Sequence, residues 1–182
     1  MEKELEAKFL DINYEETKSR LESFGAKIIK PKTLLRRAIF ENSITNNNHS
    51  WVRLRDEGDK ITLSLKQVTD NSTIHGTREL EIIVNNFEKT AQFLEGIGLI
   101  KKRYQENYRE EWQLNNTKFD FDTWPDMPIL LEIEGLDESN VKDMAQKLGF
   151  DYSKAKFGSI DSIYLEKYNR DILKETTLVF EK

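Results

Sequence analysis

The chain has 182 residues, of which 34% are charged and 37% are hydrophobic, and its formal net charge is −5. This negative balance gives no overall attraction to nucleic acid or to an anionic membrane, so neither is expected as a partner. The sequence has no cysteine and two histidines, His49 and His75, which excludes disulfides and thiolate metal sites and leaves too few imidazoles for a histidine-rich metal site.

The N-terminal residues predict one strand followed by one helix. Residues 4–9 alternate charged and apolar side chains, which places the two kinds on opposite faces of a strand. Residues 14–24 follow Asn13, a residue type that caps helix N-termini, and they stop at Gly25, a residue type that ends helices. We therefore expect a helix over residues 14–24.

The middle of the chain predicts several strands. Residues 34–40 are a candidate strand with a weaker alternation than the others. Residues 51–55 and 61–66 both alternate and flank the polar turn at residues 56–59, which predicts a β-hairpin. Residues 79–84 alternate in the same way. Because the connections between neighbouring strands are short, the sheet is expected to be largely antiparallel.

The second half of the chain continues with helices and strands. Residues 87–97 place apolar side chains near one face, which predicts a helix. Residues 99–112, 118–122 and 129–134 predict three further strands and bring the expected number to about eight. Residues 137–148 predict another helix, which ends before a glycine.

The last segments are shorter. Residues 162–168 predict a short helix, and residues 176–180 are a candidate strand for a homodimer interface. No linker or repeat divides the chain, so residues 1–182 are expected to form a single domain. No apolar run reaches the roughly 20 residues that span a bilayer, and no signal-peptide core is recognisable, so a cytoplasmic location is expected.

The polar faces of the predicted strands carry charged residues almost without exception. Where a strand carries two or three of these charged residues, one residue separates each from the next, so their side chains project from the same face of the strand. The residues on these faces are Glu4, Glu6 and Lys8; Arg53 and Arg55; Lys66; Glu79 and Glu81; Asp120 and Asp122; and Glu132 and Glu134. If the faces converge, the sheet forms a barrel with a charged interior.

The apolar faces of the same strands would then lie outside and require a cover of helices. The apolar residues expected beneath the helices are Leu5, Ala7, Phe9, Val52, Leu54, Leu80, Ile82, Leu131 and Ile133. The alternative is an ordinary sheet whose charged faces are solvated, with ion pairs that contribute little to stability.

A charged interior with both signs matches one class of ligand. Guanidinium and ammonium groups bind phosphoryl oxygens, and carboxylate pairs bind hard cations such as Mg²⁺ or Mn²⁺. Nucleoside triphosphates and inorganic polyphosphates need both kinds of group. The charge pattern is therefore consistent with a site for a small triphosphate-containing molecule and a divalent metal ion.

The N-terminal strand contains the motif ExExK as Glu4-Leu5-Glu6-Ala7-Lys8, which resembles the first strand of the CYTH superfamily, the triphosphate tunnel metalloenzymes. Further segments resemble the family in the family's order along the chain. They are Arg53-Leu54-Arg55, Ser64-Leu65-Lys66, Arg78-Glu79-Leu80-Glu81, Lys101-Lys102-Arg103, Phe121-Asp122 and Leu131-Glu132-Ile133-Glu134-Gly135. The resemblance covers roughly residues 2 to 168.

The resemblance implies an α+β fold, an eight-stranded antiparallel β-barrel that forms a tunnel with helices packed outside. It also implies roles for the matching residues. The implied phosphate-binding residues are Lys8, Arg53, Arg55, Lys66, Lys101 and Arg103. The implied metal-binding residues are Glu4, Glu6, Glu79, Glu81, Asp122, Glu132 and Glu134. The implied catalytic residues are Glu4, Glu6, Lys8, Glu132 and Glu134.

The sequence departs from the family pattern in one strand. The family often has Q-x-D-x-Y-F where this chain has Leu-Arg-Arg-Ala-Ile-Phe at residues 35–40, which retains the final phenylalanine alone. The departure leaves open whether Arg36 or Arg37 faces the interior.

The resemblance also implies an activity. We expect a Mg²⁺- or Mn²⁺-dependent enzyme that hydrolyses inorganic triphosphate, thiamine triphosphate or a nucleoside triphosphate. A class IV adenylyl cyclase, which converts ATP to cyclic AMP and pyrophosphate, is the alternative within the same fold. A polyphosphate- or nucleotide-binding module without turnover is the alternative of another class.

Overall fold

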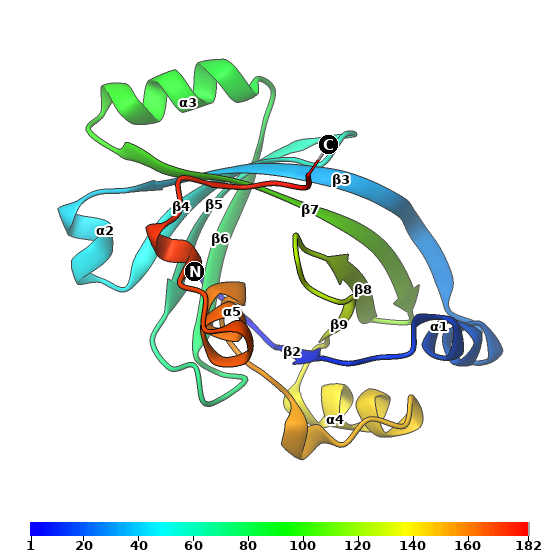
Figure 1. The fold of residues 1–182 in the computed structure, drawn as a ribbon. Helices are drawn as coiled ribbons and strands as arrows, with labels where there is room; N and C mark the ends of the chain where they lie inside the picture. The colour runs from blue at the N-terminus through cyan, green and yellow to red at the C-terminus, as the bar shows by residue number, and fades with distance from the viewer. Residues whose placement is uncertain (182) are drawn as a thin grey trace.

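The chain folds into one mostly antiparallel sheet that curls into a nearly closed barrel, with helices on its outside (Figure 1). The computed structural model describes residues 1–181. In that part of the chain the strands are β1 (Glu2–Glu4), β2 (Glu6–Phe9), β3 (Lys27–Glu41), β4 (Ser50–Asp56), β5 (Ile61–Val68), β6 (Thr77–Val84), β7 (Ile100–Leu114), β8 (Thr117–Thr123), β9 (Leu130–Glu134) and β10 (Thr177–Leu178). They follow the order β1-β6-β5-β4-β3-β7-β8-β9-β2, and β10 pairs with β7.

The N-terminal segment closes the barrel because it pairs in two directions. Its first part, β1, pairs with β6, and its second part, β2, pairs with β9, with Leu5 between them. The two ends of the sheet are therefore joined through one residue of the same segment. The barrel and the α+β class are confirmed, whereas the expected number of about eight strands becomes ten in residues 1–181, because the first strand is interrupted and β10 is added.

The helices begin where the sequence provides a cap. They are α1 (Tyr14–Ser23), α2 (Ser43–Asn47), α3 (Phe87–Gly96), α4 (Glu138–Lys147) and α5 (Ile160–Tyr168), with 3₁₀ turns η1 (Tyr152–Lys154) and η2 (Ile172–Lys174). The side chains of Asn13, Asn86 and Asp137 accept hydrogen bonds from backbone N–H groups in the first turns of α1, α3 and α4. The four predicted helices are confirmed, and α2 was not predicted.

The outward faces of the strands pack beneath the helices on two sides of the barrel. One cluster joins strands β2, β8 and β9 to α1 and α4, and includes the fully buried Ala7, Phe119 and Ile133. A second cluster joins Phe40 and Leu54 to α3. The apolar exterior is thus largely covered, as Figure 1 shows for α3 and α4.

Part of the predicted outer core is wrong. Leu80 and Ile82 on β6 are 53% and 54% exposed, because α3 packs over β4 and β7, and β5 separates β4 from β6. The C-terminal strand predicted for residues 176–180 is present as β10, and it pairs in parallel with β7 of the same chain. Within residues 1–181, the helices are too short or too polar for a membrane span.

Candidate functional site

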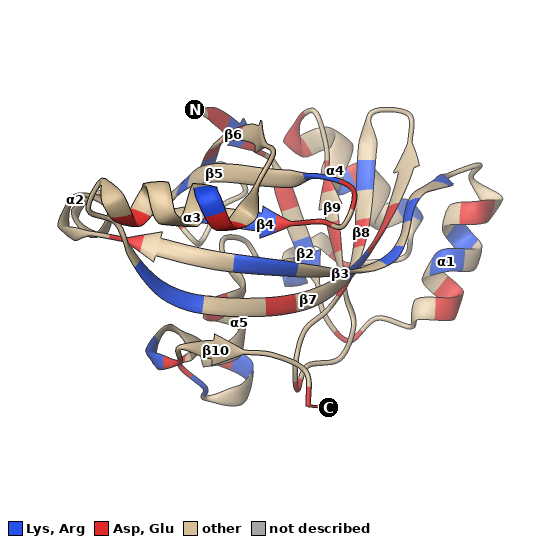
Figure 2. Ribbon diagram, turned by 90° about the horizontal axis from the view of Figure 1, so that it is seen from above, with Lys and Arg blue, Asp and Glu red and all other residues tan. Residues whose placement is uncertain are grey.

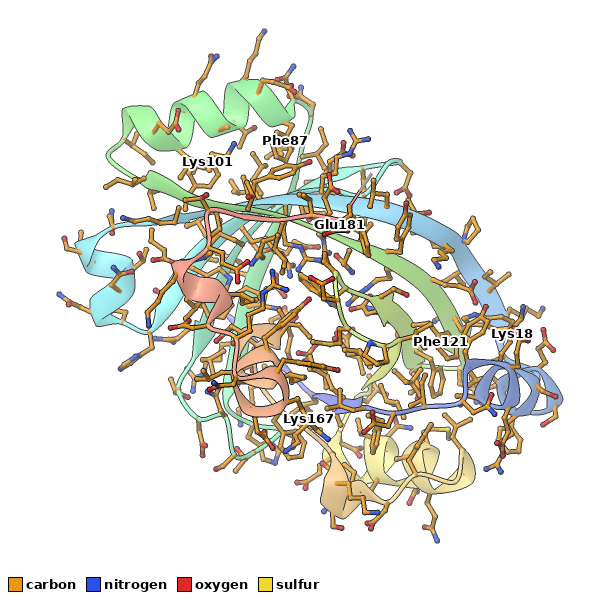
Figure 3. The ribbon with its side chains drawn as sticks, in the orientation of Figure 1. Lys18, Phe87, Lys101, Phe121, Lys167 and Glu181 are labelled. Atoms are coloured by element: carbon orange, nitrogen blue, oxygen red, sulfur yellow. The ribbon has the colours of Figure 1, made fainter. Side chains whose placement is uncertain are left out.

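The inward-facing side chains of the barrel surround a cavity of about 840 Å³. Charged residues from β1 to β9 line it, so the predicted charged interior is confirmed. Figure 2 shows acidic bands on β8 and β9 and a basic band on β3, and Figure 3 shows side chains extending into the barrel from the surrounding strands. The two signs of charge are concentrated on different strands.

Four buried cations from three adjacent strands form one side of the cavity, which we name the basic wall: Arg37, Arg53, Arg55 and Lys66. Each is at most 9% exposed. Arg37 on β3 lies directly opposite Arg55 on β4 in the strand register, and Lys66 belongs to β5. Burial and the neighbouring Arg53 and Arg55 lower the pKa of Arg37 well below its ordinary value. The basic wall therefore concentrates positive charge in a place shielded from water.

Three carboxylates that the family resemblance assigns to the metal region contact the basic wall. Arg53 Nη2 donates to Glu79 Oε1 at 2.8 Å and to Glu81 Oε2 at 3.2 Å. Lys66 Nζ lies 2.8 Å from Glu4 Oε2 and 3.2 Å from Glu79 Oε2. In this geometry Glu4, Glu79 and Glu81 orient cations.

The carboxylate of Glu57, at the turn between β4 and β5, contacts Arg55 of the basic wall and was not predicted. It accepts hydrogen bonds from Arg55 Nε at 2.8 Å and Thr62 Oγ1 at 3.2 Å, and Lys30 Nζ lies 3.3 Å away. Burial favours its neutral form, but the cations Arg55 and Lys60 outweigh burial and lower its pKa to about 2. Glu57 therefore stays ionised and fixes the guanidinium of Arg55.

Four buried carboxylates form the opposite side of the cavity, which we name the acidic wall: Glu6, Asp120, Asp122 and Glu132. They come from β2, β8 and β9 and are each at most 8% exposed. Asp120 lies opposite Glu132 in the register of β8 and β9. Burial is the main cause that raises the pKa of Asp120 well above its ordinary value.

A single arginine from β7 binds three members of the acidic wall. Arg109 Nη1 lies 2.7 Å from Asp120 Oδ2, and its Nη2 lies 2.6 Å from Asp122 Oδ2 and 3.5 Å from Glu132 Oε1. Burial opposes its charge, but these carboxylates raise the pKa of Arg109 well above its ordinary value. Arg109 is therefore a permanent cation inside the acidic wall.

Glu6 and Glu132 lie beside Lys8, and their pKa values shift in opposite directions. Burial and the charge of Glu132 raise the pKa of Glu6. Burial also works against ionisation of Glu132, yet Lys8 and Arg109 lower its pKa well below the ordinary value. Lys8 contacts Glu6 and lies 3.6 Å from Glu132 Oε2. The like charge of the two carboxylates disfavours ionisation of both at once, and a bound cation would offset this repulsion.

The acidic wall has the donor chemistry of a site for a hard divalent cation. Asp120 Oδ1 is buried and has no hydrogen-bond partner among residues 1–181. In that part of the chain, no group of three or more carboxylates or imidazoles is already arranged as a metal site, because Lys8 and Arg109 are paired with these carboxylates. Carboxylate oxygens are nevertheless the ligands that Mg²⁺ and Mn²⁺ prefer, so the residues fit such an ion.

The two basic residues expected from β7 lie in different places. Arg103 lines the cavity near one end, where it contacts Glu41 and its Nη1 donates to the carbonyl oxygen of Leu173 at 3.1 Å. Figure 3 places Lys101 on the α3 side of β7, away from the interior, and its Nζ lies 5.7 Å from the ring of Tyr104. The structure therefore separates Lys101 from the other predicted phosphate-binding residues.

The remaining positions are also resolved by the geometry. Glu134 lines the cavity but is partly exposed, and its Oε2 lies 3.1 Å from Lys118 Nζ. On β3, Arg36 is exposed and Arg37 faces the cavity, which settles the open question about this strand.

Strand periodicity offered a signal for one of the residues that were missed. Arg103, Gln105 and Arg109 are separated by even numbers of residues on β7, so all three share the inward face. Counting outward from Arg103 would have found Arg109. Arg37 and Glu57 had no comparable signal, because a second arginine precedes Arg37 and Glu57 lies in a turn.

Comparisons with known proteins agree with this geometry. The sequence model of the CYTH domain family matches residues 2–164. No curated protein matches the chain. Among solved structures, a protein from Pyrococcus horikoshii is similar with 22% identity and a TM-score of 0.71, covering 84% of this chain and 93% of that chain.

Two further structures carry functional descriptions. A proposed adenylate cyclase from Vibrio parahaemolyticus is similar with 10% identity and a TM-score of 0.78, covering 89% of this chain and 97% of that chain. A proposed adenylyl cyclase from Hippeastrum, described as having a dominant triphosphatase activity, has 15% identity and a TM-score of 0.60, covering 95% of this chain and 99% of that chain. At these identities the likeness shows a shared fold.

Proposed function

Because the chain belongs to the CYTH domain family, we propose that it is a metal-dependent enzyme that hydrolyses a triphosphate inside the barrel. The observation that carries the proposal is the division of one cavity into a basic wall and an acidic wall. A triphosphate with a divalent cation has the complementary division, with anionic phosphoryl oxygens on one side and a positive ion on the other. The small-molecule partner is therefore a triphosphate.

The basic wall would bind and orient the phosphoryl groups. Arg53 and Arg55 are held by Glu79 and Glu57, so their guanidinium groups lose little rotational freedom when an anion binds. Burial strengthens each charge-assisted hydrogen bond to a phosphoryl oxygen, because water is excluded. Lys8, whose pKa is raised by Glu132 and Glu6 against the effect of burial, remains charged and would contribute an ammonium donor from the other side.

The acidic wall would hold Mg²⁺ or Mn²⁺ through Glu6, Asp120 and Glu132, with Asp122 beside them and Glu4 and Glu134 as further expected ligands. When bound, such an ion would neutralise phosphoryl charge and make a coordinated water more acidic. Arg109 would keep the carboxylates of the acidic wall in place, since it contacts three of them.

Hydrolysis is preferred over cyclisation because of the Hippeastrum relative, whose description names a dominant triphosphatase activity. A cyclase would use the same two walls, with a ribose 3′-hydroxyl attacking the α-phosphorus of ATP. Trp124, one aromatic residue at the cavity, is 3% exposed and lies against Arg37, so it packs inside the protein and is not free to stack on a base.

A substrate panel tests the proposal. Purified protein is incubated with tripolyphosphate, thiamine triphosphate or ATP, each with Mg²⁺ or Mn²⁺, while phosphate, pyrophosphate and cyclic AMP are measured. We expect phosphate release that stops when EDTA removes the metal. Equal amounts of cyclic AMP and pyrophosphate from ATP would show that the protein is a cyclase and not a hydrolase. Binding of a triphosphate without any product would show that the protein is a binding module.

A further inference from the structure

Arg37 differs from the other buried cations that line the cavity, because in the described part of the chain it has no carboxylate partner. The paired cations are Lys8, Arg53, Arg55, Lys66, Arg103 and Arg109, and each forms at least one ion pair. No ion pair of Arg37 is found among residues 1–181. Its Nε is also buried without a hydrogen-bond partner within the described chain.

The side chain of Arg37 is nevertheless held firmly. Its Nη2 donates to Asn107 Oδ1, and the amide of Asn107 donates in turn to Asp122 Oδ1 at 3.2 Å. The guanidinium carbon lies 4.5 Å from the centre of the Trp124 ring, a cation–π contact. Arg37 is therefore oriented by neutral groups, and Asp122, a carboxylate that favours its charge, is joined to it only through Asn107.

The surroundings of Arg37 increase the electrostatic cost. Arg37 is 7% exposed, and its register partner on β4 is another arginine, Arg55. A buried guanidinium next to like charge is unfavourable unless an anion accompanies it. Its other register partner, Gln105 on β7, is buried at the cavity and adds an amide. Three adjacent strands thus place two guanidinium groups and one amide side by side.

We propose that Arg37, Arg55 and Gln105 form a subsite for a terminal phosphoryl group of the substrate, with Arg37 as the residue whose counter-ion is that phosphoryl group. A terminal phosphoryl group carries more negative charge than an internal one and has three free oxygens, which suits two forked donors and an amide. The inference rests on the proposed function and adds to it, because a subsite for an unsubstituted phosphoryl end fits inorganic tripolyphosphate as well as the γ-phosphoryl group of a nucleotide.

The test compares Arg37→Gln with Arg36→Gln, a matched control on the same strand whose side chain is exposed. Affinity for sodium tripolyphosphate is measured by calorimetry without metal, and the melting temperature is measured with and without tripolyphosphate. We expect Arg37→Gln to raise the dissociation constant about tenfold or more, since it removes charge-assisted hydrogen bonds. Without ligand, its melting temperature should equal or exceed that of the wild type, because an unpaired buried charge is gone.

The control should match the wild type in both measurements, and Arg37→Lys should bind with intermediate affinity because it keeps the charge without the fork. Equal affinity of Arg37→Gln and wild type overturns the inference. A lower melting temperature without ligand together with unchanged affinity would show a structural role and also overturn it. If Arg37→Gln does not fold, Arg37→Met provides the same comparison with an apolar side chain of similar length.

The two proposals fail in different ways. Absence of phosphate release by the wild type removes the hydrolase function but leaves the subsite if tripolyphosphate binding depends on Arg37. Phosphate release by the wild type together with unchanged binding by Arg37→Gln removes the subsite and leaves the hydrolase. Failure of the wild type to bind tripolyphosphate overturns the subsite, whereas the hydrolase function fails only if none of the three triphosphates in the substrate panel releases phosphate.

Discussion

The basic wall and the acidic wall are built alike but carry excess charge of opposite sign. Each consists of side chains on alternating strand positions, and each is buried inside the barrel. The basic wall has an excess of positive charge at Arg37, which forms no ion pair within residues 1–181. The acidic wall has an excess of carboxyl groups. Burial, and after it the charge of neighbouring Glu132, raises the pKa values of Glu6 and Asp120.

This difference shows how one barrel can be stable and still bind both an anion and a cation. Most charges on either wall form internal ion pairs, which offset part of the cost of burying them. The remaining charges are costly to bury, and a bound anion and a bound cation would each relieve one wall. Substitutions on the two walls should therefore affect different steps, metal-dependent turnover on the acidic wall and phosphate binding on the basic wall.

The largest effect is expected on the acidic wall. Glu6→Gln should lower kcat on the order of 100-fold, because it removes a hard oxygen ligand. Its melting temperature should change little, because burial raises the pKa of Glu6 and disfavours its charged form, which the neutral glutamine replaces. Phosphate release and thermal unfolding measure the two effects.

Glu95→Gln, at an exposed position on α3, provides the control for that substitution. Unchanged turnover in Glu6→Gln would contradict the role assigned to the acidic wall. A large fall in melting temperature would instead show that Glu6 is mainly structural.

A change on the basic wall should act on binding first. Arg53→Gln is expected to raise KM for tripolyphosphate roughly ten- to hundredfold, because a buried charge-assisted contact to a phosphoryl oxygen is lost. Arg78→Gln on β6, whose side chain is exposed, is the matched control. An unchanged KM would remove Arg53 from the phosphate-binding residues.

A smaller effect, on the pH dependence of stability, is expected at Glu57, which contacts Arg55 of the basic wall. Its folded pKa of about 2 lies below the ordinary value of 4.5, so the ionised group stabilises the fold above the unfolded pKa. This stability, about 2–3 kcal/mol, is lost as the pH falls through the folded pKa. Glu57→Gln should therefore melt at a lower temperature than the wild type at pH 7.

The difference between Glu57→Gln and the wild type should shrink between about pH 4.5 and pH 2, where Glu57 of the wild type becomes protonated. Thermal unfolding over this pH range is the measurement, and KM at pH 7 should rise a few-fold because Arg55 loses its support. A difference in stability that does not depend on pH would contradict the ion-pair account.

The smallest effect is expected outside both walls. Lys101→Ala should leave kcat and KM within about twofold of the wild type, because the Lys101 side chain is exposed and lies away from the interior. Kinetics with tripolyphosphate measure the effect. A tenfold rise in KM would contradict this prediction and show that Lys101 binds phosphate, as the family resemblance implies.

Much of the fold could be predicted because period-two alternation is a direct consequence of strand geometry. Trp51 to Arg55 shows this well, since Leu54 is buried outside under α3 and Arg53 and Arg55 lie inside. The interruption at Leu5 could not be predicted, because the alternation continues on both sides of it. It depends on how far β6 and β9 extend, which is a long-range property.

The membership of the walls was harder to predict than their existence. Alternation assigns a residue to a face, but register decides which residues on different strands become neighbours. Arg109 meets Asp122 because β7 and β8 pair in that register, and Glu79 meets Lys66 for the same reason on β5 and β6. Local sequence contains neither pairing.

The melting temperature of the wild-type protein with tripolyphosphate and Mg²⁺, added separately and together, tests the two-wall account most directly. Tripolyphosphate alone should raise the melting temperature, and both together should raise it by more than the sum of the separate shifts, because a bound metal ion and the bound phosphoryl groups would also attract each other. No shift with tripolyphosphate, in the presence or absence of Mg²⁺, would contradict the account.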